Sequence, residues 1–217
     1  MSLCDSFGRE LSYLRLSLIS KCNLNCWYCR PYEKSQEGDQ SFPLNISEIK
    51  NLAKALGPLG IKKIRLTGGE PTLRNDLAKI IQALAETNYF EKIALSTNGL
   101  RLKTLARPLQ SAGLHALNIS VDSLDPQQYY QITGADRLSD VLEGIDASLQ
   151  TGIKTIKINA VLMKGINSES LSSFLALIKK APLSVRFIEF MKTENNSSLF
   201  TRLHLSRCLR HPWPWCF

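Results

Sequence analysis

Hydrophobic and polar residues alternate in five of the six short apolar segments of the chain. In the first, Leu14, Leu16 and Leu18 are separated by Arg15 and Ser17. Because side chains alternate between the two faces of a strand, each such segment has an apolar side and a polar side. The pattern predicts strands over residues 13–19, 62–67, 92–97, 116–122, 154–161 and 184–190.

Segments with a helical pattern separate these strands. We expect helices over about 47–56, 75–88, 101–112, 126–151 with a break near Gly134, and 168–180. Asn75 is the clearest predicted helix start, and Ser47 with Lys50 gives part of a capping signal. Strands that alternate with helices are typical of right-handed β-α-β units and a parallel sheet.

The polar side of the strands decides between kinds of α/β fold. Strands covered by helices on both faces would be almost continuously apolar, and these are not. The polar side must face water or a polar ligand, because unpaired charges in a dry core are very costly. We expect a partial (β/α)6 barrel of parallel strands with helices outside and ligands at the carboxyl ends of the strands. An open sheet with one face in solvent is the alternative.

Three cations lie on the predicted polar side, namely Arg15, Arg65 and Lys157. Guanidinium groups bind phosphates in a bidentate manner, so this set favours a phosphate-rich ligand. The alternative for Arg15 is an ion pair with a nearby carboxylate such as Glu10.

Composition narrows the class of protein. The 217 residues are 44% apolar and 21% charged, without an apolar run long enough to cross a membrane. The first ten residues lack the order of a secretory signal, so we expect a cytoplasmic protein without membrane contact. The net charge of +8 is spread without a basic run, which argues against a nucleic-acid partner.

Half of the six cysteines lie in "SKCNLNCWYC", spaced C-x3-C-x2-C directly after the first strand. Three thiolates on one loop can hold an iron–sulfur cluster with one iron open to another ligand. A structural zinc site normally has four protein ligands, so zinc is the less favoured alternative, and unreactive buried cysteines are the third. The metal ligands are therefore predicted to be Cys22, Cys26 and Cys29.

A second motif, "TGGEP", follows the second strand. Gly68 and Gly69 allow a ligand to approach the backbone closely, although a tight turn would use the same residues. Together with the cysteine spacing and Tyr28 before the last cysteine, this motif resembles the radical S-adenosylmethionine (SAM) superfamily. Further segments, including "LSTNG", "LNISVDSLDPQQY" and "VRFIEFM", are similar to the MoaA family of GTP 3′,8-cyclases in order over about residues 7–191.

The resemblance implies a radical reaction of molybdenum cofactor biosynthesis. In that family the three cysteines hold a [4Fe–4S] cluster whose open iron binds SAM, and an electron from the cluster cleaves SAM to a 5′-deoxyadenosyl radical. The radical takes the C3′ hydrogen of GTP, and C3′ then adds to C8 of guanine. The lyase product is (8S)-3′,8-cyclo-7,8-dihydroguanosine 5′-triphosphate.

The resemblance also implies roles for single residues. Tyr28, Gly69, Ser120 and Met191 fall at SAM positions, and Arg15, Arg65, Ser96 and Lys157 at GTP positions. Each has an ordinary alternative, such as loop packing for Tyr28 or a core position for Met191. The implied partners are GTP as substrate and an electron donor such as flavodoxin or ferredoxin, with a homodimer as a further expectation.

The sequence after "FIEFM" is predicted to depart from the family. We expect a radical SAM core over 7–191 and a divergent or truncated tail over 192–217. Cys208 and Cys216 lack the C-x2-C spacing of the family's second cluster, and the terminal glycines are absent. The expectation is a chain that binds the first cluster and SAM but is impaired on GTP. A short radical SAM enzyme with another substrate and a non-catalytic metal-binding protein are the alternatives.

Overall fold

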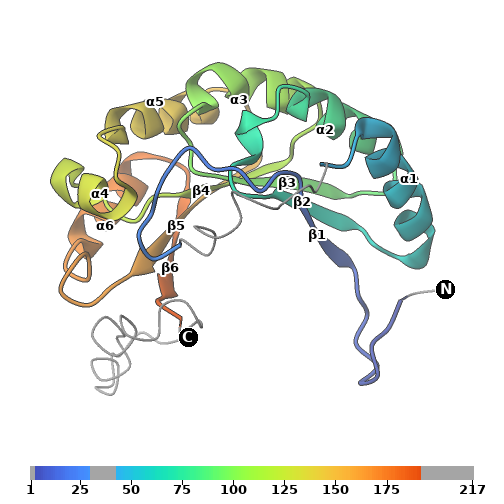
Figure 1. Ribbon diagram of the computed structural model, residues 1–217, viewed down its shortest axis with the longest axis horizontal. Coiled ribbons are helices and arrows are strands. Elements are labelled where there is room, and N and C mark those ends of the chain that lie inside the picture. Colours follow the sequence, from blue (N-terminus) through green and yellow to red (C-terminus); the bar gives the residue numbers. More distant parts are fainter. Residues whose placement is uncertain (1–2, 30–42, 192–217) are drawn as a thin grey trace, which may run out of the picture. The chain divides into compact units, whose positions relative to one another are not determined.

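The computed structural model of the protein describes residues 3–29 and 43–191 (Figure 1). Our predictions for the tail over 192–217, including Cys208 and Cys216, lie outside these residues. So does most of the polar loop that follows Cys29.

Six strands form one sheet whose order follows the chain, with β1 and β6 at its two edges. The strands are β1 (Tyr13–Ser17), β2 (Lys63–Thr67), β3 (Lys92–Thr97), β4 (Ala116–Ser120), β5 (Thr155–Leu162) and β6 (Ser184–Glu189). The pairs β1–β2, β2–β3 and β3–β4 are parallel. The order confirms the predicted α/β fold, and the described sheet is open, as a partial barrel requires.

Helices connect successive strands, as the sequence predicts. The α-helices are α1 (Ile46–Leu56), α2 (Leu77–Ala85), α3 (Leu102–Ser111), α4 (Pro126–Thr133), α5 (Leu138–Leu149) and α6 (Leu171–Lys180). Two short 3-10 helices, η1 (Gly57–Leu59) and η2 (Pro71–Leu73), precede and follow β2. The predicted break near Gly134 is confirmed, because Gly134 ends α4 in a left-handed conformation (φ 72°).

The chain divides into two compact units. The first contains residues 1–23, 39–120 and 139–157, and the second contains residues 24–38, 121–138 and 158–217. The cysteine motif lies across this division, with Cys22 in the first unit and Cys26 and Cys29 in the second.

The core of the first unit lies on one side of β1–β4, where α1, α2, α3 and α5 run along the strands (Figure 1). The alternation of polar and apolar residues explains this arrangement. In β2, Ile64 and Leu66 are buried while Arg65 between them is only half-buried. Apolar residues from α2 complete the core, including Leu77, Ile80, Ile81 and Leu84.

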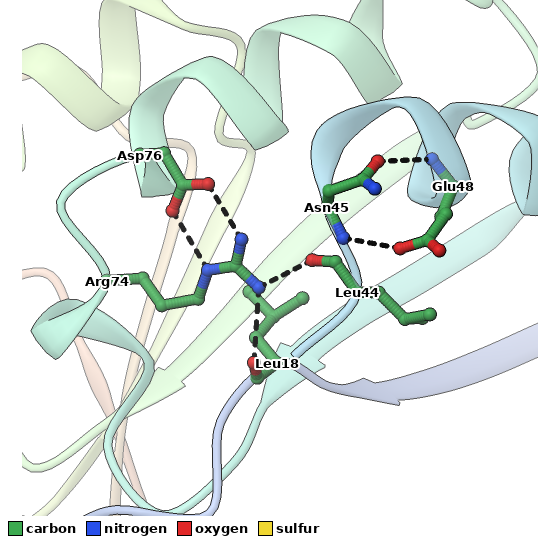
Figure 2. Close-up of polar contacts among 6 residues, drawn as sticks. All are labelled: Leu18, Leu44, Asn45, Glu48, Arg74 and Asp76. Carbon is green, nitrogen blue, oxygen red and sulfur yellow. Dashed lines mark hydrogen bonds and ion pairs between the residues drawn. The ribbon is translucent and has the colours of Figure 1, made fainter. Parts of the chain in front are cut away.

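Polar contacts lie at the starts of α1 and α2 (Figure 2). The side chain of Asn45 accepts from the Glu48 backbone N–H (3.0 Å), and Glu48 accepts from the Asn45 backbone N–H (2.7 Å). This capping box, and not Ser47 with Lys50, starts α1. Helix α2 begins after Asp76 and not at Asn75, and the Asp76 carboxylate accepts two bonds from Arg74 (2.9 and 2.7 Å).

The guanidinium group of Arg74 also joins the end of β1 to the start of α1 in the first unit. It donates to the backbone carbonyls of Leu18 (3.3 Å) and Leu44 (2.8 Å), as Figure 2 shows. The half-buried guanidinium group of Arg74 thus bonds two backbone carbonyls and the carboxylate of Asp76.

The second unit has a smaller core of its own. Ile132 of α4, Met163 and Phe190 are buried together, and the partly buried side chains that pack on them are Trp27, Tyr28, Val161 and Ile166. The segment that carries two of the cysteines is therefore part of a hydrophobic core. No helix within the described ranges 3–29 and 43–191 is both long and apolar enough to cross a membrane.

Candidate functional site

Arg15 and Arg65 lie side by side on the polar face of the first unit. They are register partners on β1 and β2, and paired positions on parallel strands project to the same face. Arg15 is exposed and Arg65 is half-buried, with its guanidinium carbon 5.6 Å from the centre of the Tyr13 ring. Two like charges on neighbouring strands repel each other, so this face favours an anion between or above them.

Arg65 has a further feature of a ligand-binding side chain. Its Nε is buried, and no described residue accepts a hydrogen bond from it. A buried donor without an acceptor is costly, so such groups commonly bind a ligand or water.

Polar side chains continue along the same face of β3 and β4. Ala94 pairs with Arg65, which places Ser96 two residues further along the same face, and Ser96 pairs with Asn118. Ser96 is half-buried, Asn118 is buried, and Ser120 at the end of β4 is exposed. Arg15, Arg65, Ser96 and Ser120 therefore share one face of β1–β4, as the alternation predicts.

Asn118 belongs to this row although the family resemblance assigned it no role. Its side-chain amide donates weakly to the Leu95 carbonyl (3.4 Å), and its Oδ1 is buried without a donor among the described residues. The alternation of β4 was the signal that could have added it to the site.

Lys157, the third predicted cation, is the last residue of the first unit along the sequence. It is half-buried on β5 between the buried residues Ile156 and Ile158, so it lies on the more exposed side of its strand. Its convergence with Arg15 and Arg65 stays a prediction.

Gly68 and Gly69 bring the end of β2 against the segment before Cys22. Gly69 N–H donates to the Ile19 carbonyl (2.7 Å), and Glu70 N–H donates to the Lys21 carbonyl (2.8 Å). A Cβ at Gly69 would overlap the carbonyl oxygens of Ser20 and Lys21. The glycine is therefore required for a close approach of two backbones, which positions the chain directly ahead of the first cysteine.

Glu70 is a buried carboxylate that joins three loops of the first unit. Its Oε1 accepts from Thr72 N–H (2.9 Å), the Thr72 hydroxyl (2.5 Å) and the Thr97 hydroxyl (2.7 Å), while Oε2 accepts from Asn98 N–H (2.7 Å). Asn98 in turn donates through its side chain to Asn23 Oδ1 (2.7 Å). The two residues that flank Cys22 are thus held by the loops after β2 and β3.

Neither Glu70 nor Asn98 was among the predicted site residues. Glu70 lies in the motif "GGEP" and Asn98 in the motif "STNG", and these two motifs are the sequence features that could have pointed to them. The motifs mark the loops after β2 and β3 as candidate parts of the site, but they do not show which side chains connect these loops.

In the second unit, the backbone around Cys26 is fixed by α4. Asn25 N–H donates to the Thr133 carbonyl (3.0 Å), and Trp27 N–H donates to the Ile132 carbonyl (3.2 Å). The last carbonyls of a helix lack partners within the helix, so they are available for such bonds. A turn closed by Cys29 N–H on the Cys26 carbonyl (3.0 Å) then brings the next cysteine back toward Cys26.

Tyr28 combines ring packing with a strong hydrogen bond. Its ring centre lies 5.8 Å from that of Trp27 and 6.2 Å from that of Phe190. Its hydroxyl donates to Asp122 Oδ2 (2.5 Å), and Asp122 Oδ1 accepts from Val161 N–H (2.8 Å). Burial raises the pKa of both Tyr28 and Asp122, and the carboxylate raises that of Tyr28 further.

Asp122 was not predicted as a site residue. The side chain of Asn167 donates to its backbone carbonyl (2.6 Å), so the end of β4 is tied to the loop after β5. Met191, predicted at the SAM adenine, follows the buried Phe190 and is 71% exposed. The SAM contacts of Tyr28 and Met191 stay predictions.

The three motif cysteines are the candidate ligands of a metal centre. Cys22 and Cys29 are exposed and Cys26 is half-buried, and all three are thiols, as is Cys4 near the N-terminus. Among residues 3–29 and 43–191, no three His, Cys, Asp or Glu side chains are already grouped to hold a metal ion. The donor set nevertheless fits a thiolate-bound cluster, because three thiols lie within eight residues on backbone fixed on both sides.

Comparison with known proteins agrees with this donor set. The family described as "Radical SAM superfamily" matches residues 16–178, which include the three cysteines and strands β2–β5.

Curated relatives share the sequence over most of the chain. A GTP 3′,8-cyclase of Aeromonas hydrophila subsp. hydrophila is 48% identical over 212 residues, covering 95% of this chain and 62% of the relative. One of Tolumonas auensis is 45% identical over 219 residues, covering 98% and 65%. The chain thus spans about three fifths of the length of these relatives. A match over 98% of the chain extends past residue 191, and the divergence of residues 192–217 stays a prediction.

Solved structures share the fold at low sequence identity. Streptococcus suis SuiB bound to S-adenosylmethionine has a TM-score of 0.70 at 18% identity, covering 84% of this chain and 41% of that one. Methylornithine synthase (PylB) has a TM-score of 0.63 at 18% identity, covering 84% and 54%. Family match, cysteine spacing and strand order agree: the chain belongs to the radical SAM superfamily.

Proposed function

We propose that the chain carries the SAM- and cluster-binding core of a GTP 3′,8-cyclase of molybdenum cofactor biosynthesis. The observation that carries the proposal is the pair Arg15 and Arg65, in register on the polar face of β1 and β2. Iron–sulfur chemistry and a cationic face for a triphosphate are both needed for this reaction. The relatives named above support the choice of GTP as substrate.

Cys22, Cys26 and Cys29 would hold the [4Fe–4S] cluster. Hydrogen bonds on either side of Cys22 and of Cys26 fix the chain that presents these thiols. When bound, the cluster and SAM supply a one-electron cleavage that creates a hydrogen-abstracting radical. The protein's own contribution is to position the ligands, supply charge and exclude water.

Tyr28, Gly69, Ser120 and Met191 are proposed to contact SAM. Gly69 is supported by the close backbone approach after β2, which leaves no room for a side chain. Ser120 is supported by its exposed position at the carboxyl end of β4, where ligands of such sheets bind. The Tyr28 hydroxyl is bonded to Asp122, so its contact with SAM would come from the ring or backbone.

Arg15, Arg65, Ser96 and Lys157 are proposed to bind GTP. Arg65 has the strongest support, because its buried Nε needs an acceptor and a phosphate oxygen provides one. Ser96 shares the face of Arg65 and can donate a hydroxyl hydrogen bond to the nucleotide.

The proposal is tested by nucleotide binding and by product analysis under anaerobic conditions. Arg65→Gln is expected to weaken GTP binding by about tenfold, because a charge-assisted phosphate contact is lost. Arg107→Gln on α3, an exposed arginine of the same unit, is the matched control and should leave binding unchanged. Equal binding of GTP by wild type and Arg65→Gln would contradict the proposed site.

Reconstituted protein with reductant and SAM should form 5′-deoxyadenosine, and GTP should be consumed to the cyclised nucleotide. The prediction that these 217 residues alone convert GTP poorly is measured in the same assay. Purified protein that holds zinc, without iron or sulfide, would instead support the non-catalytic alternative.

We further propose an electron donor such as flavodoxin or ferredoxin, a homodimer and a cytoplasmic location. The exposed thiols support a reducing compartment, where they stay available to a cluster. Sedimentation of the anaerobic protein measures the oligomeric state, and reduction by either donor can be followed spectroscopically.

A further inference from the structure

Two hydrogen bonds from different loops of the first unit lie on either side of Cys22. Before it, the carbonyl of Lys21 accepts from Glu70 N–H (2.8 Å). After it, Oδ1 of Asn23 accepts from the side-chain amide of Asn98 (2.7 Å). The first bond holds a backbone atom, whereas the second holds the side chain of an exposed residue. The restraint on the chain after Cys22 therefore depends on how firmly Asn98 itself is held.

Asn98 is a buried residue with a fixed orientation. Its backbone N–H donates to Glu70 Oε2 (2.7 Å), and its Oδ1 accepts from Leu100 N–H (3.2 Å). An asparagine amide has one oxygen and one NH₂ group, so the bond from Leu100 directs the NH₂ group to Asn23. The turn to Leu100 uses only the oxygen of Asn98 and does not account for the bond to Asn23.

Glu70 connects the two bonds beside Cys22. Its backbone N–H bonds Lys21, and its carboxylate, which is only 1% exposed, accepts from the backbone of Asn98. Both neighbours of Cys22 are thus linked to one buried residue. Hydrogen bonds to a buried charged group are stronger than those between neutral groups, so this is a rigid support for an exposed segment.

We propose that Asn98 is a positioning residue for Cys22 and acts through the side chain of Asn23. This inference rests on the proposed role of Cys22 as a cluster ligand. Groups that fix the position of a metal ligand increase the affinity of the site, so the bond between Asn98 and Asn23 should slow the loss of iron. This role needs no contact between Asn98 and the cluster.

Metal-free protein under reducing, anaerobic conditions provides the first test. Asn23→Ala removes the acceptor from an exposed position, so the peptide that contains Cys22 should exchange its amide hydrogens about fivefold faster than in wild type. Asn23→Asp retains an acceptor for the amide of Asn98 and should exchange at the wild-type rate. Hydrogen–deuterium exchange with peptide mass spectrometry measures both.

A second substitution tests whether Asn98 is the donor. Asn98→Ser keeps a hydroxyl that can accept from Leu100 N–H but is too short to reach Asn23. It should speed exchange of the Cys22 peptide as Asn23→Ala does, and the double variant should show no further increase, because the same bond is already lost.

Asn51→Ala is the matched control, since Asn51 is an exposed asparagine on α1 of the same unit. It should leave exchange of the Cys22 peptide unchanged. Wild-type exchange in Asn23→Ala, fast exchange in Asn23→Asp, or additive effects in the double variant would each overturn the proposal. Thermal unfolding shows whether the variants retain the fold, and the comparison of the two Asn23 variants does not depend on Asn98→Ser.

Cluster-loaded protein provides the last test. Asn23→Ala should release iron to excess EDTA on the order of fivefold faster than wild type, while Asn23→Asp and Asn51→Ala match wild type. Equal release by Asn23→Ala and wild type would overturn the proposal. If wild type binds no iron, the proposed function fails, and the exchange rates still decide whether Asn98 positions Cys22.

Discussion

Among single residues, Glu70 is a buried carboxylate whose two oxygens both accept hydrogen bonds. Four donors from two segments, one after β2 and one at the end of β3, converge on its two oxygens. In Glu70→Gln, the side-chain NH₂ must face at least one of these donors, whichever way the amide is oriented. We expect the free energy of unfolding to fall by about 2 kcal/mol.

Urea denaturation measures this loss. Glu86→Gln is the matched control, because Glu86 is exposed and pairs only loosely with Lys50 (3.4 Å). Equal stability of Glu70→Gln and the control would contradict the importance of the Glu70 contacts.

His115 gives the first unit a pH-dependent stability. Its Nδ1 accepts from Ile93 N–H (3.2 Å), which requires an unprotonated nitrogen. Burial, followed by the positive charges of Lys154 and Lys92, lowers the pKa of His115 below its ordinary value of 6.5. The unfolded chain therefore binds the proton more readily, so this contribution to stability is present above pH 6.5 and is lost as pH falls through the lower folded pKa.

His115→Asn keeps an acceptor near the Nδ1 position and does not titrate. Between about pH 7.5 and pH 5, the stability of wild type should fall more steeply than that of this variant. Parallel stability curves from denaturant titrations would contradict the assignment.

At the scale of elements, the loop between β2 and η2 positions the chain before Cys22. Gly69→Ala would place a methyl group against the backbone of Ser20 and Lys21, so the two segments must separate. We expect a loss of about 2 kcal/mol in unfolding free energy and reduced iron loading.

Gly152→Ala separates this clash from backbone strain. Gly152 has φ +80° but nothing near the position of a Cβ, so alanine there should cost only about 1 kcal/mol and leave iron loading unchanged. Normal iron content in Gly69→Ala would show that the loop does not position the cysteines.

The sequence could predict which residues form strands and which face of each strand is polar. The alternation around Arg15 and Arg65 placed both on the polar face, because the period of a strand is a local property. The cap at Asn45 was missed because Ser47 offered a similar local signal, and only the bonds to Glu48 distinguish the two. Asp122 was missed because its importance depends on contacts with residues far away in the sequence.

At the scale of the whole molecule, the chain joins a cationic strand face to a cysteine segment held by its own core. The positions of the strands follow from periodicity, and the family resemblance predicted the radical SAM superfamily to which the chain belongs. The divergence of the tail after residue 191 stays a prediction, because the overall identity of the relatives does not show how similarity is distributed along the chain.

The central claim is that Cys22, Cys26 and Cys29 together hold an iron–sulfur cluster. The most direct measurement is the iron and sulfide content of anaerobically reconstituted protein, with its absorption and electron paramagnetic resonance spectra. Wild type and Cys4→Ser should each bind about four iron and four sulfide, and replacement of all three motif cysteines by serine should abolish binding. Colourless wild-type protein, or a triple variant that retains the cluster, would contradict the claim.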